Sequence, residues 1–376
     1  MEKHKFSFQT RIGPSLGTSV RHWMKLVLTN GSVALRYYPR VFFVNAVSSL
    51  GIPFRLYERF KFNSKVDATE ISSPPIFILG HWRSGTTHLH NVMCQDTQFG
   101  FITMLQAMFP KSFMSNNIFR HLTSIFLPKT RPMDNMEMNV NNPQEEEMAL
   151  GNLFPYSFYN GFYFPQRTME YFFKYIRFKN TSIKVLEQWK KVYYYLIKKA
   201  TLNMSGRQLI LKNPANTARI KLLLNLFPDA KFIHIYRNPY VVYASMRNFY
   251  KKTIEGFMLQ SVPDKQIENN IFSLYKQLMT SYFKEKQLIP HGNLIELKFE
   301  DFEVNTMNEL NRIYSELDIN GFEKAKNKMA FYLSSLSDYK KNTYNLTHEI
   351  INSIKRKWDF TIKKWNYDIP IELQLV

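Results

Sequence analysis

The stretch Pro75-Ile76-Phe77-Ile78-Leu79-Gly80-His81-Trp82-Arg83-Ser84-Gly85-Thr86-Thr87-His88 decides which fold the chain adopts. A short apolar run leads into a loop with a glycine near each end, and a helical pattern follows. In this arrangement backbone N–H groups and a helix N-terminus bind anions such as phosphate. Gly80 and Gly85 have the spacing of a nucleoside-triphosphate-binding loop, but Thr86 stands where that loop requires lysine. The loop's own basic residue is Arg83. The stretch therefore predicts a phosphate-binding loop that lacks the usual lysine.

Further strands and helices alternate along the chain after this loop. The apolar runs predict strands, and the periodic segments that follow them predict helices. The strands are 75–79, 208–212, 231–236 and 294–297, and the helices are 85–95, 215–226, 240–250 and 300–317. Alternation of this kind is typical of a parallel sheet covered by helices. We therefore expect an α/β, P-loop-like three-layer fold with a central parallel β-sheet flanked by helices, a largely helical insertion and a helical N-terminal layer.

No shift in composition divides the 376 residues, so we interpret residues 1–376 as one domain. Within it we expect five segments with different roles. These are an N-terminal helical layer (1–70), the phosphate-binding strand, loop and helix (72–97), a helical acceptor-binding insertion (98–205), a core with a second phosphate site (206–320) and a C-terminal helical cap (321–376).

Composition restricts the environment and the partners of the chain. Hydrophobic residues make up 45% and aromatic residues 16%, which excludes a disordered chain. The single cysteine, Cys94, fits a reducing compartment, and no signal-peptide pattern or membrane-spanning apolar run is present, so we expect a cytoplasmic protein. The net charge is +20, but no nucleic-acid-binding motif accompanies it. Aromatic and basic residues in the N-terminal helices fit either a layer packed on the core or peripheral contact with a membrane.

Two further basic residues follow predicted strands. Lys212 ends the second strand, and Arg237 comes directly after the third, with Ser245 eight residues later on the following helix. Ligands of open parallel sheets bind at the carboxyl ends of the strands. Each residue alone fits an ordinary role, since a lysine at a strand end is usually solvated. Together with the loop they predict a ligand with at least two separated anionic groups.

These motifs resemble those of the sulfotransferase family. Residues 75–87 resemble its 5'-phosphosulfate-binding loop, and Tyr236-Arg237-Asn238-Pro239 with Ser245 resembles its 3'-phosphate-binding segment. Leu211-Lys212-Asn213-Pro214 lies between the two, as in the family, and 297–302 resembles a late strand with acidic residues. The resemblance covers residues 72–320 and is closest to a bacterial branch with the loop G-H-W-R-S-G-T-T-H-L-H.

The resemblance implies sulfuryl transfer from 3'-phosphoadenosine 5'-phosphosulfate (PAPS), with no metal ion. It assigns the 5'-phosphate to Arg83, Ser84, Gly85, Thr86 and Thr87, and the 3'-phosphate to Arg237 and Ser245. Arg83 and Lys212 would neutralise charge on the leaving nucleotide. Lys340 and Lys341 lie where relatives close a basic loop over the nucleotide, although the glycine of that loop is missing here.

The general base is not where cytosolic relatives carry a histidine, because Pro214 occupies that position. Glu145 and Glu147, in a run that resembles an acidic element of the bacterial branch, are the first candidates, and His81 is a rival. The run equally fits the acidic first turn of a helix. His88, on the helix after the loop, is expected to be structural.

Aromatic and methionine residues are frequent between 98 and 175, where they line an acceptor pocket or fill a helical core. We expect a hydrophobic acceptor with a hydroxyl group, such as a sterol or another lipid alcohol, rather than a glycan or a phenol. The alternatives from other classes are a P-loop small-molecule kinase and a non-catalytic nucleotide-binding module at a membrane surface. The sequence does not indicate the oligomeric state.

Overall fold

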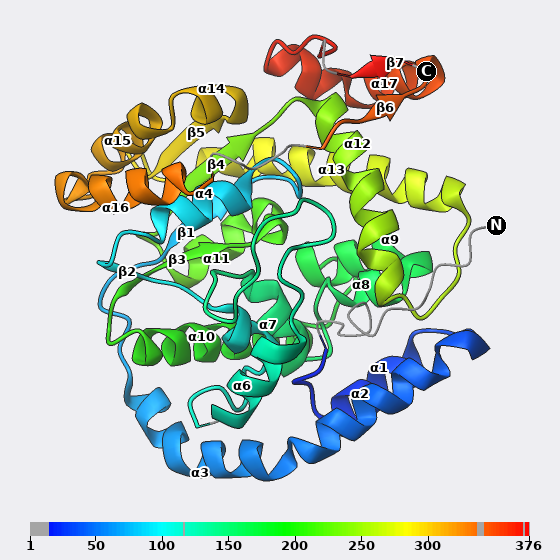
Figure 1. Cartoon of the computed structure of the whole chain (residues 1–376), viewed down its shortest axis with the longest axis vertical. Coiled ribbons are helices and arrows are strands. Elements are labelled where there is room, and N and C mark those ends of the chain that lie inside the picture. Colours follow the sequence, from blue (N-terminus) through cyan, green and yellow to red (C-terminus); the bar gives the residue numbers. More distant parts are fainter. Residues whose placement is uncertain (1–14, 116, 337–341, 371–372, 376) are drawn as a thin grey trace. The chain divides into compact units, whose positions relative to one another are not determined.

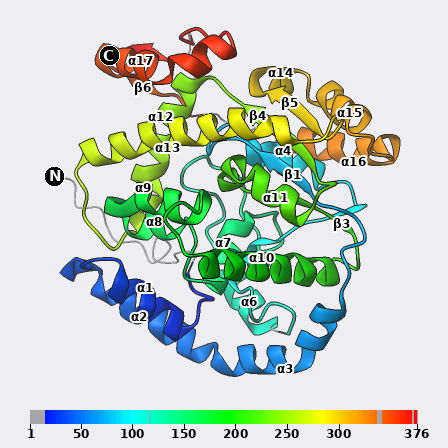
Figure 2. The ribbon, with the colours of Figure 1, turned by 180° about the vertical axis from the view of Figure 1, so that it is seen from behind.

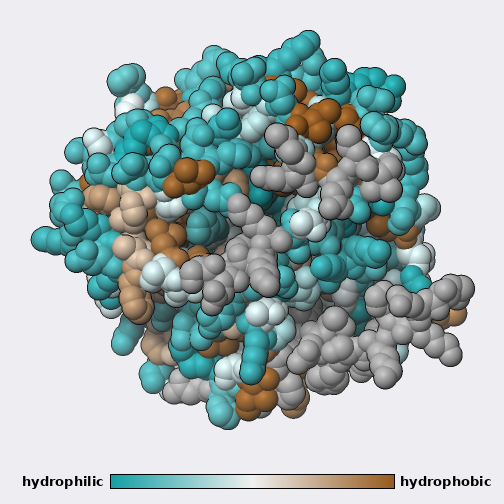
Figure 3. All heavy atoms as spheres, turned by 45° about the horizontal axis from the view of Figure 1, so that its top comes forward, coloured by the Kyte–Doolittle hydropathy of each residue, from teal (hydrophilic) through white to brown (hydrophobic). Residues whose placement is uncertain are grey.

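The computed structural model describes residues 15–115, 117–336, 342–370 and 373–375. The chain forms two compact units (Figure 1). Unit 1 comprises residues 1–69, 102–203 and 249–267, and unit 2 comprises residues 70–101, 204–248 and 268–376. On the face drawn in Figure 3, hydrophilic residues predominate and hydrophobic residues form small separate groups.

Unit 2 is built on a parallel sheet of five strands in the order β2-β3-β1-β4-β5. The strands are β1 (Ile76–Leu79), β2 (Phe99–Gly100), β3 (Gln208–Lys212), β4 (Lys231–Tyr236) and β5 (Leu294–Lys298). After β1 the chain adds β2 and β3 on one side of it, and then β4 and β5 on the other. The order therefore reverses at β1, and such a reversal is where parallel sheets bind ligands. The loop that the sequence predicts to bind phosphate directly follows this strand.

Alternate side chains of the strands point to opposite faces of the sheet, and both faces are buried. On one face, Ile76 and Ile78 of β1 join a core with α4 (Thr86–Met93), α14 (Phe299–Val304), α15 (Thr306–Glu316) and α16 (Phe322–Ser334). On the other, Phe77 stacks on Phe232 of β4 with ring centroids 5.5 Å apart, and it also contacts Phe227, which follows α11 (Ile220–Leu226).

The second face is also covered by α13 (Asp264–Glu285) and α17 (His348–Lys364), which lie on the same side as α11 (Figure 2). His234 of β4 stacks on Tyr282 of α13 at 3.7 Å, and Tyr236 stacks on Trp365 just after α17 at 4.5 Å. A small parallel pair, β6 (Asn345–Leu346) and β7 (Gln374–Leu375), lies near the C-terminus.

The predicted three-layer α/β fold is confirmed, and its four strands are found within one residue of the predicted bounds. The helix predicted over 300–317 is instead two helices, α14 and α15. Asn305 separates them because its backbone leaves the helical region, with φ −123° and ψ 45°. The helix predicted over 215–226 likewise begins as the 3₁₀ turn η5 (Pro214–Ala218) before α11.

Unit 1 is helical in its described residues, apart from two isolated bridges. Its α-helices are α1 (Val20–Thr29), α2 (Tyr38–Leu50), α3 (Ile52–Ala68), α5 (Met104–Met108), α6 (Asn117–Phe126), α7 (Glu146–Leu153), α8 (Asn160–Tyr163), α9 (Thr168–Tyr171) and α10 (Ile183–Asn203). The helix α12 (Pro239–Lys252) ends in this unit and α13 begins in it. Short turns are η2 (Leu35–Tyr37), η3 (Pro165–Arg167), η6 (Ile254–Gly256) and the π-helical η4 (Phe172–Ile176), and η7 (Lys286–Leu288) belongs to unit 2.

The helices α3 and α10 of unit 1 are joined by a buried ion pair. Lys199 donates to the Glu58 carboxylate, and each side chain is only 2% exposed. Glu58 also accepts from the backbone N–H groups of Met114 and Ser115 at 2.9 and 3.0 Å. This network compensates the cost of burying both charges. In the described part of the chain, no helix is long and apolar enough to cross a membrane.

Candidate active site

The loop after β1 uses backbone conformations that side chains rarely allow. Gly80 has φ +143°, Arg83 φ +73° and Gly85 φ +95°. Positive φ costs little for glycine, but it is uncommon for arginine and points to a functional constraint. A Cβ on Gly80 would lie 2.4 Å from the Ile235 carbonyl oxygen, and one on Gly85 would lie 2.1 Å from the Phe299 ring. Both positions therefore require glycine, because φ is positive and because a side chain would clash with neighbouring atoms.

Hydrogen bonds hold the loop on the sheet. The buried Ser84 hydroxyl donates to the carbonyl oxygens of His81 (2.7 Å) and Ile235 (3.1 Å). The Gly80 N–H donates to the Thr217 hydroxyl of η5 at 2.8 Å, and that hydroxyl lies 3.1 Å from the Gly80 carbonyl oxygen. The hydroxyls of Ser84 and Thr217 therefore shape the loop itself. Thr86 is buried and Thr87 is half-buried in the first turn of α4.

Arg83, Ser245 and Tyr344 form a hydrogen-bonded group in unit 2. The Arg83 Nε–H donates to the Ser245 hydroxyl of α12 at 2.9 Å, and the Tyr344 hydroxyl donates to the same oxygen at 3.0 Å. Ser245 Oγ is therefore shared by hydrogen bonds to Arg83 and Tyr344. The sequence-predicted residues of the two phosphate sites, Arg83 and Ser245, are thus in direct contact.

Arg237 packs on the ring of Phe299, the same ring that leaves no room for a side chain at Gly85. Its guanidinium carbon is 4.2 Å from the centroid of Phe299, a cation–π contact. Burial is the main cause that lowers the pKa of Arg237, and the charge of Arg83 lowers it further, while Glu303 and Glu300 raise it. Arg237 is thus a half-buried cation, which a bound anion would compensate.

Backbone and carboxylate contacts fix the chain just after Arg237. The Asn238 N–H donates to Glu300 at 3.0 Å, and the Tyr367 hydroxyl donates to the other oxygen of that carboxylate at 2.6 Å. The Asn238 side chain donates to the Asp368 carbonyl oxygen at 2.8 Å. These contacts hold the start of α12, which carries Ser245.

Lys212 is buried, with 2% of its surface exposed, rather than solvated as a lysine at a strand end usually is. In the sheet it pairs with Ile78, two residues before Gly80. Its charge, after burial, contributes to lowering the pKa of the neighbouring His90 to about 3. Burial of an ammonium group beside the anion-binding loop supports a role for its charge there.

His81 is buried and His88 is half-buried beside the loop. His81 Nδ1 lies 2.6 Å from the Trp82 carbonyl oxygen, so this nitrogen carries the proton, and burial lowers the pKa of His81 to about 4. Burial also lowers the pKa of His88, whose ring packs against Phe302 at 5.5 Å. Both are less suited to accept a proton than a group with a pKa near neutrality. Lys340 and Lys341 lie outside the described residues.

The three consecutive glutamates of unit 1 are buried and have different partners. Glu145 is the N-cap of α7 and accepts from the Tyr159 hydroxyl. Glu147 accepts from the Ser157 hydroxyl (2.8 Å) and the Phe158 N–H (3.0 Å), and so holds the turn before α8. The interpretation of the run as an acidic first turn is correct, yet burial makes these side chains unlike ordinary solvated helix-end acids.

Glu146, which the sequence analysis did not select, has a raised pKa. It is fully buried, and burial raises its pKa to about 7, with the neighbouring charges of Glu147 and Glu145 adding to the effect. The Tyr193 hydroxyl of α10 donates to it at 3.2 Å. Three adjacent glutamates after a proline were the available signal, but only the fold reveals which carboxyl group points into the core.

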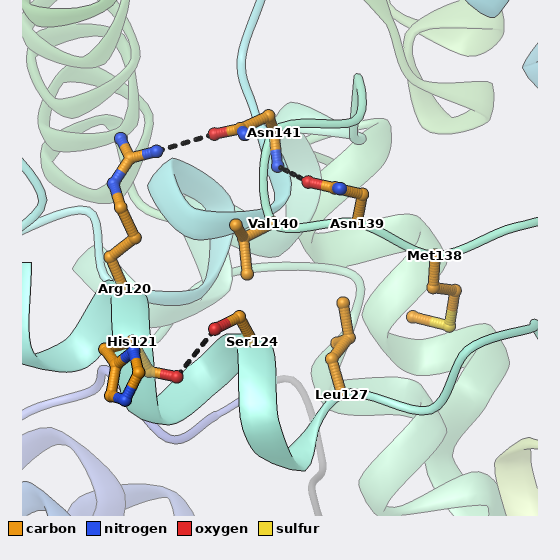
Figure 4. A pocket seen from close by; sticks show the side chains of 8 residues that line it. All are labelled: Arg120, His121, Ser124, Leu127, Met138, Asn139, Val140 and Asn141. Carbon is orange, nitrogen blue, oxygen red and sulfur yellow. Dashed lines mark hydrogen bonds between the residues drawn. The ribbon is translucent and has the colours of Figure 1, made fainter.

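Most of the aromatic and methionine residues expected to line an acceptor pocket are core residues of unit 1. Phe109, Phe158 and Phe162 are examples, and each is buried. An open hollow of about 370 Å³ in this unit lies between α6 and the segment before α7 (Figure 4). Its lining is mostly polar and comprises Arg120, His121, Ser124, Leu127, Met138, Asn139, Val140 and Asn141. None of the residues predicted for the site lines it.

Tyr344, Phe299 and Thr217 belong to the loop site but were not selected from the sequence. Phe299 lies within a recognised motif, whereas Tyr344 is separated from Ser245 by 99 positions and carries no local signal. Their importance depends on contacts across the fold.

Comparison with known proteins agrees with this geometry. Residues 74–324 match the family model described as "Sulfotransferase family". Two relatives named omega-hydroxy-beta-dihydromenaquinone-9 sulfotransferase Stf3, from Mycobacterium bovis and Mycobacterium tuberculosis, are 31% identical over 355 residues, covering 94% of this chain and 91% of theirs. The chain therefore belongs to the sulfotransferase family.

Solved structures of sulfotransferases share the fold. STF9 from Mycobacterium avium has a TM-score of 0.72 at 13% identity, over 94% of this chain and 91% of that one. STF1 from Mycobacterium tuberculosis has a TM-score of 0.62 at 16% identity, over 94% and 93%. The protein is thus a transferase enzyme that moves a sulfuryl group, and the kinase and non-catalytic alternatives are set aside.

Proposed function

We propose that this enzyme transfers the sulfuryl group of PAPS to the hydroxyl group of a long apolar lipid. The observation that carries the donor assignment is the group formed by Arg83, Ser245 and Tyr344, together with the second guanidinium of Arg237. Two arginines from different segments of the chain, Arg83 and Arg237, suit a ligand with two separated phosphate groups. The loop backbone and Arg83 would hold the 5'-phosphosulfate, and Arg237 and Ser245 the 3'-phosphate.

The donor supplies an activated sulfuryl group and leaves as a nucleotide. In our proposal Arg83 and Lys212 neutralise the negative charge that grows on the bridging oxygen during transfer. Charges already in place and shielded from water stabilise such a transition state without reorganisation. The burial of Lys212 and the strained backbone of Arg83 support this role.

We propose Glu145 as the general base that takes the proton of the acceptor hydroxyl. Glu145 is 9% exposed, while Glu147 is fully buried and holds the Ser157–Phe158 turn. His81 ranks below Glu145 because it is more deeply buried, with 2% of its surface exposed.

The lipid acceptor is supported by the two relatives that are named for a hydroxylated dihydromenaquinone. Their identity to this chain extends over nearly its whole length, including unit 1. We therefore propose a hydroxyl group at the end of, or attached to, a long apolar skeleton. Sterols, glycans and phenols are the alternatives that an assay must compare.

The test is an assay with PAPS carrying radiolabelled sulfur and a panel of isoprenoid alcohols, sterols, phenols and sugars. We expect labelled product with the lipid alcohols. Arg237→Ala should raise the KM for PAPS by about 10- to 100-fold, because charge-assisted hydrogen bonds are lost, with a smaller change in kcat. Arg312→Ala, which removes an exposed arginine of α15, is the matched control.

The base assignment has its own readout. Glu145→Gln should lower kcat by about 10²- to 10⁴-fold with little change in the affinity for the nucleotide. Absence of labelled product from every alcohol while the nucleotide binds would contradict the proposed acceptor class. A fall in kcat for Arg237→Ala equal to that for Glu145→Gln would contradict the division of roles.

A further inference from the structure

The helices α2 and α3 of unit 1 are apolar on two opposite sides. On the inner side of α2, Val41 and Val44 are buried, and the Trp23 indole of α1 donates to the Val41 carbonyl oxygen at 3.2 Å. A helix that is apolar all round is normally enclosed by protein or lipid. Here the outer side remains uncovered by the described residues of the chain, so it requires an explanation.

The outer side carries a continuous row of large apolar side chains, which we name the α2–α3 stripe. On α2, Tyr38, Phe42, Ala46 and Leu50 follow one another at intervals of four residues and therefore share one face. On α3 the row continues with Ile52, Leu56 and Phe60, again at intervals of four, and with Tyr57 beside them. Phe42, Leu50, Leu56 and Phe60 are 67%, 71%, 61% and 92% exposed.

The two helices follow one another with little interruption (Figures 1 and 2). Gly51 ends α2 and begins α3 with a backbone still in the right-handed helical region, φ −76° and ψ −9°. The Arg55 guanidinium donates to the Ser48 carbonyl oxygen at 2.6 Å across this junction. The stripe is therefore held as one surface rather than as two independent helices.

The residues around the stripe are mostly basic. Between residues 15 and 68, where α3 ends, the sequence contains eight lysines and arginines and two acids, Glu58 and Asp67. Glu58 is 2% exposed and paired with Lys199, so Asp67 is the acid that reaches the surface. Arg36, Arg59, Lys61 and Lys65 are exposed beside the stripe.

We propose that the α2–α3 stripe docks on the surface of a bilayer that contains anionic lipids. Apolar side chains of an interfacial helix enter the boundary between headgroups and acyl chains, while basic residues at its edges contact anionic headgroups. A second copy of this chain fits less well, because the exposed arginines and lysines of two identical surfaces would face each other. The inference rests on this surface alone and holds whichever acceptor the enzyme uses.

Flotation with vesicles tests the proposal on the full-length protein. The protein should bind vesicles of phosphatidylcholine with one quarter phosphatidylglycerol, and high salt should release it from them. It should bind vesicles of phosphatidylcholine alone at least about tenfold more weakly. The double variant Phe42→Ser with Phe60→Ser should weaken binding to the anionic vesicles by at least about tenfold. Arg59→Gln with Lys61→Gln should weaken it by a similar factor.

The helix α16 offers matched controls. Phe331 is 78% exposed on this helix, and Lys324 and Lys328 are exposed there too. Phe331→Ser, and Lys324→Gln with Lys328→Gln, should leave vesicle binding within about twofold of the unchanged protein. Circular dichroism and affinity for adenosine 3',5'-bisphosphate should match for all variants, which separates loss of docking from loss of fold.

Three results would overturn the proposal. The first is no binding of the unchanged protein to anionic vesicles. The second is equal binding by the Phe42 and Phe60 double variant and by Phe331→Ser. The third is a dimer in analytical ultracentrifugation that dissociates in the double variant, because the stripe would then bind a second copy. Sulfuryl transfer to a short water-soluble alcohol is measured separately, so failure of docking is distinguishable from failure of the proposed function.

Discussion

Replacing Gly85 by alanine should test whether the loop and the Arg237 site are joined through the Phe299 ring. Gly85 has φ +95°, which costs a residue with a side chain about 1–2 kcal/mol. The new Cβ would also lie 2.1 Å from the Phe299 ring, which is 6% exposed and packed in the core. Overpacking of this kind costs about 1–3 kcal/mol. We therefore expect Gly85→Ala to lower the free energy of unfolding by about 2–5 kcal/mol.

The same substitution should weaken binding of the nucleotide. Displacing the ring removes the cation–π contact that holds Arg237, worth about 0.5–2 kcal/mol, which corresponds to a loss of affinity of about two- to thirtyfold. Urea unfolding gives the stability, and titration calorimetry with adenosine 3',5'-bisphosphate gives the affinity.

Gly206 and Gly292 are controls that separate the two costs. Both have positive φ, +80° and +81°, but a Cβ on either would have nothing within 4 Å. Gly206→Ala and Gly292→Ala should therefore lower the free energy of unfolding only by the cost of the positive φ, and they should leave nucleotide affinity unchanged. In the double variant Gly85→Ala with Phe299→Ala, the loss of unfolding free energy should be smaller than the sum of the losses in the two single variants by at least about 1 kcal/mol. Equal losses for Gly85→Ala and Gly206→Ala, or strict additivity in the double variant, would refute the steric argument.

Three further predictions concern single groups. Tyr344→Phe removes one hydrogen bond to Ser245 and should weaken binding of adenosine 3',5'-bisphosphate by about two- to tenfold in calorimetry. The control Tyr57→Phe on α3 should leave this affinity unchanged. An unchanged affinity for Tyr344→Phe would show that Tyr344 is not part of the nucleotide site. Glu146 has its pKa raised from 4.5 to about 7 in the folded protein, so the native state binds the extra proton and stability falls as pH rises through this range. Glu146→Gln should therefore gain stability over the unchanged protein between pH 5 and pH 8 by up to about 3 kcal/mol in urea unfolding, and a difference independent of pH would contradict this. Lys199→Met should lower the free energy of unfolding by about 3–5 kcal/mol because it leaves the Glu58 carboxylate buried without its cation. The double variant Lys199→Met with Glu58→Gln should regain most of that free energy. Equal instability of the single and double variants would show that the buried charge is not the cause.

The sequence alone was sufficient for four of the five strands and for the glycines of the loop, whereas β2 (Phe99–Gly100) was not predicted because it is only two residues long. Strands such as Ile76–Leu79 are short continuous apolar runs because both of their faces are buried, and this local signal needs no tertiary information. Gly80 and Gly85 mark positions of positive φ, which the residue type itself reveals. Arg83 and Arg237 could be selected because residues that follow parallel strands meet at one edge of the sheet, whereas Ser245, on the following helix, was selected from the resemblance to the sulfotransferase family.

Other features depend on contacts between distant segments. Tyr344 donates a hydrogen bond to Ser245, 99 positions away in the sequence. The Phe299 ring excludes a side chain at Gly85 and packs against Arg237. Neither residue type is distinctive in its local sequence. The three adjacent glutamates also look alike in the sequence, but the fold gives each a different hydrogen-bond partner. Burial raises the pKa of Glu146 to about 7.

The sequence by itself thus determined the family and the three-layer fold, and it selected two arginines that we propose bind the phosphate groups of the donor. These follow from local apolar patterns and from residue types that have few alternative uses. Tertiary structure decided which hydroxyls shape the loop, which carboxyl group titrates near neutrality, and that α2 and α3 keep an apolar side exposed. Burial, hydrogen-bond partners and exposure are properties of the packed chain, because they depend on which distant side chains remove a group from water.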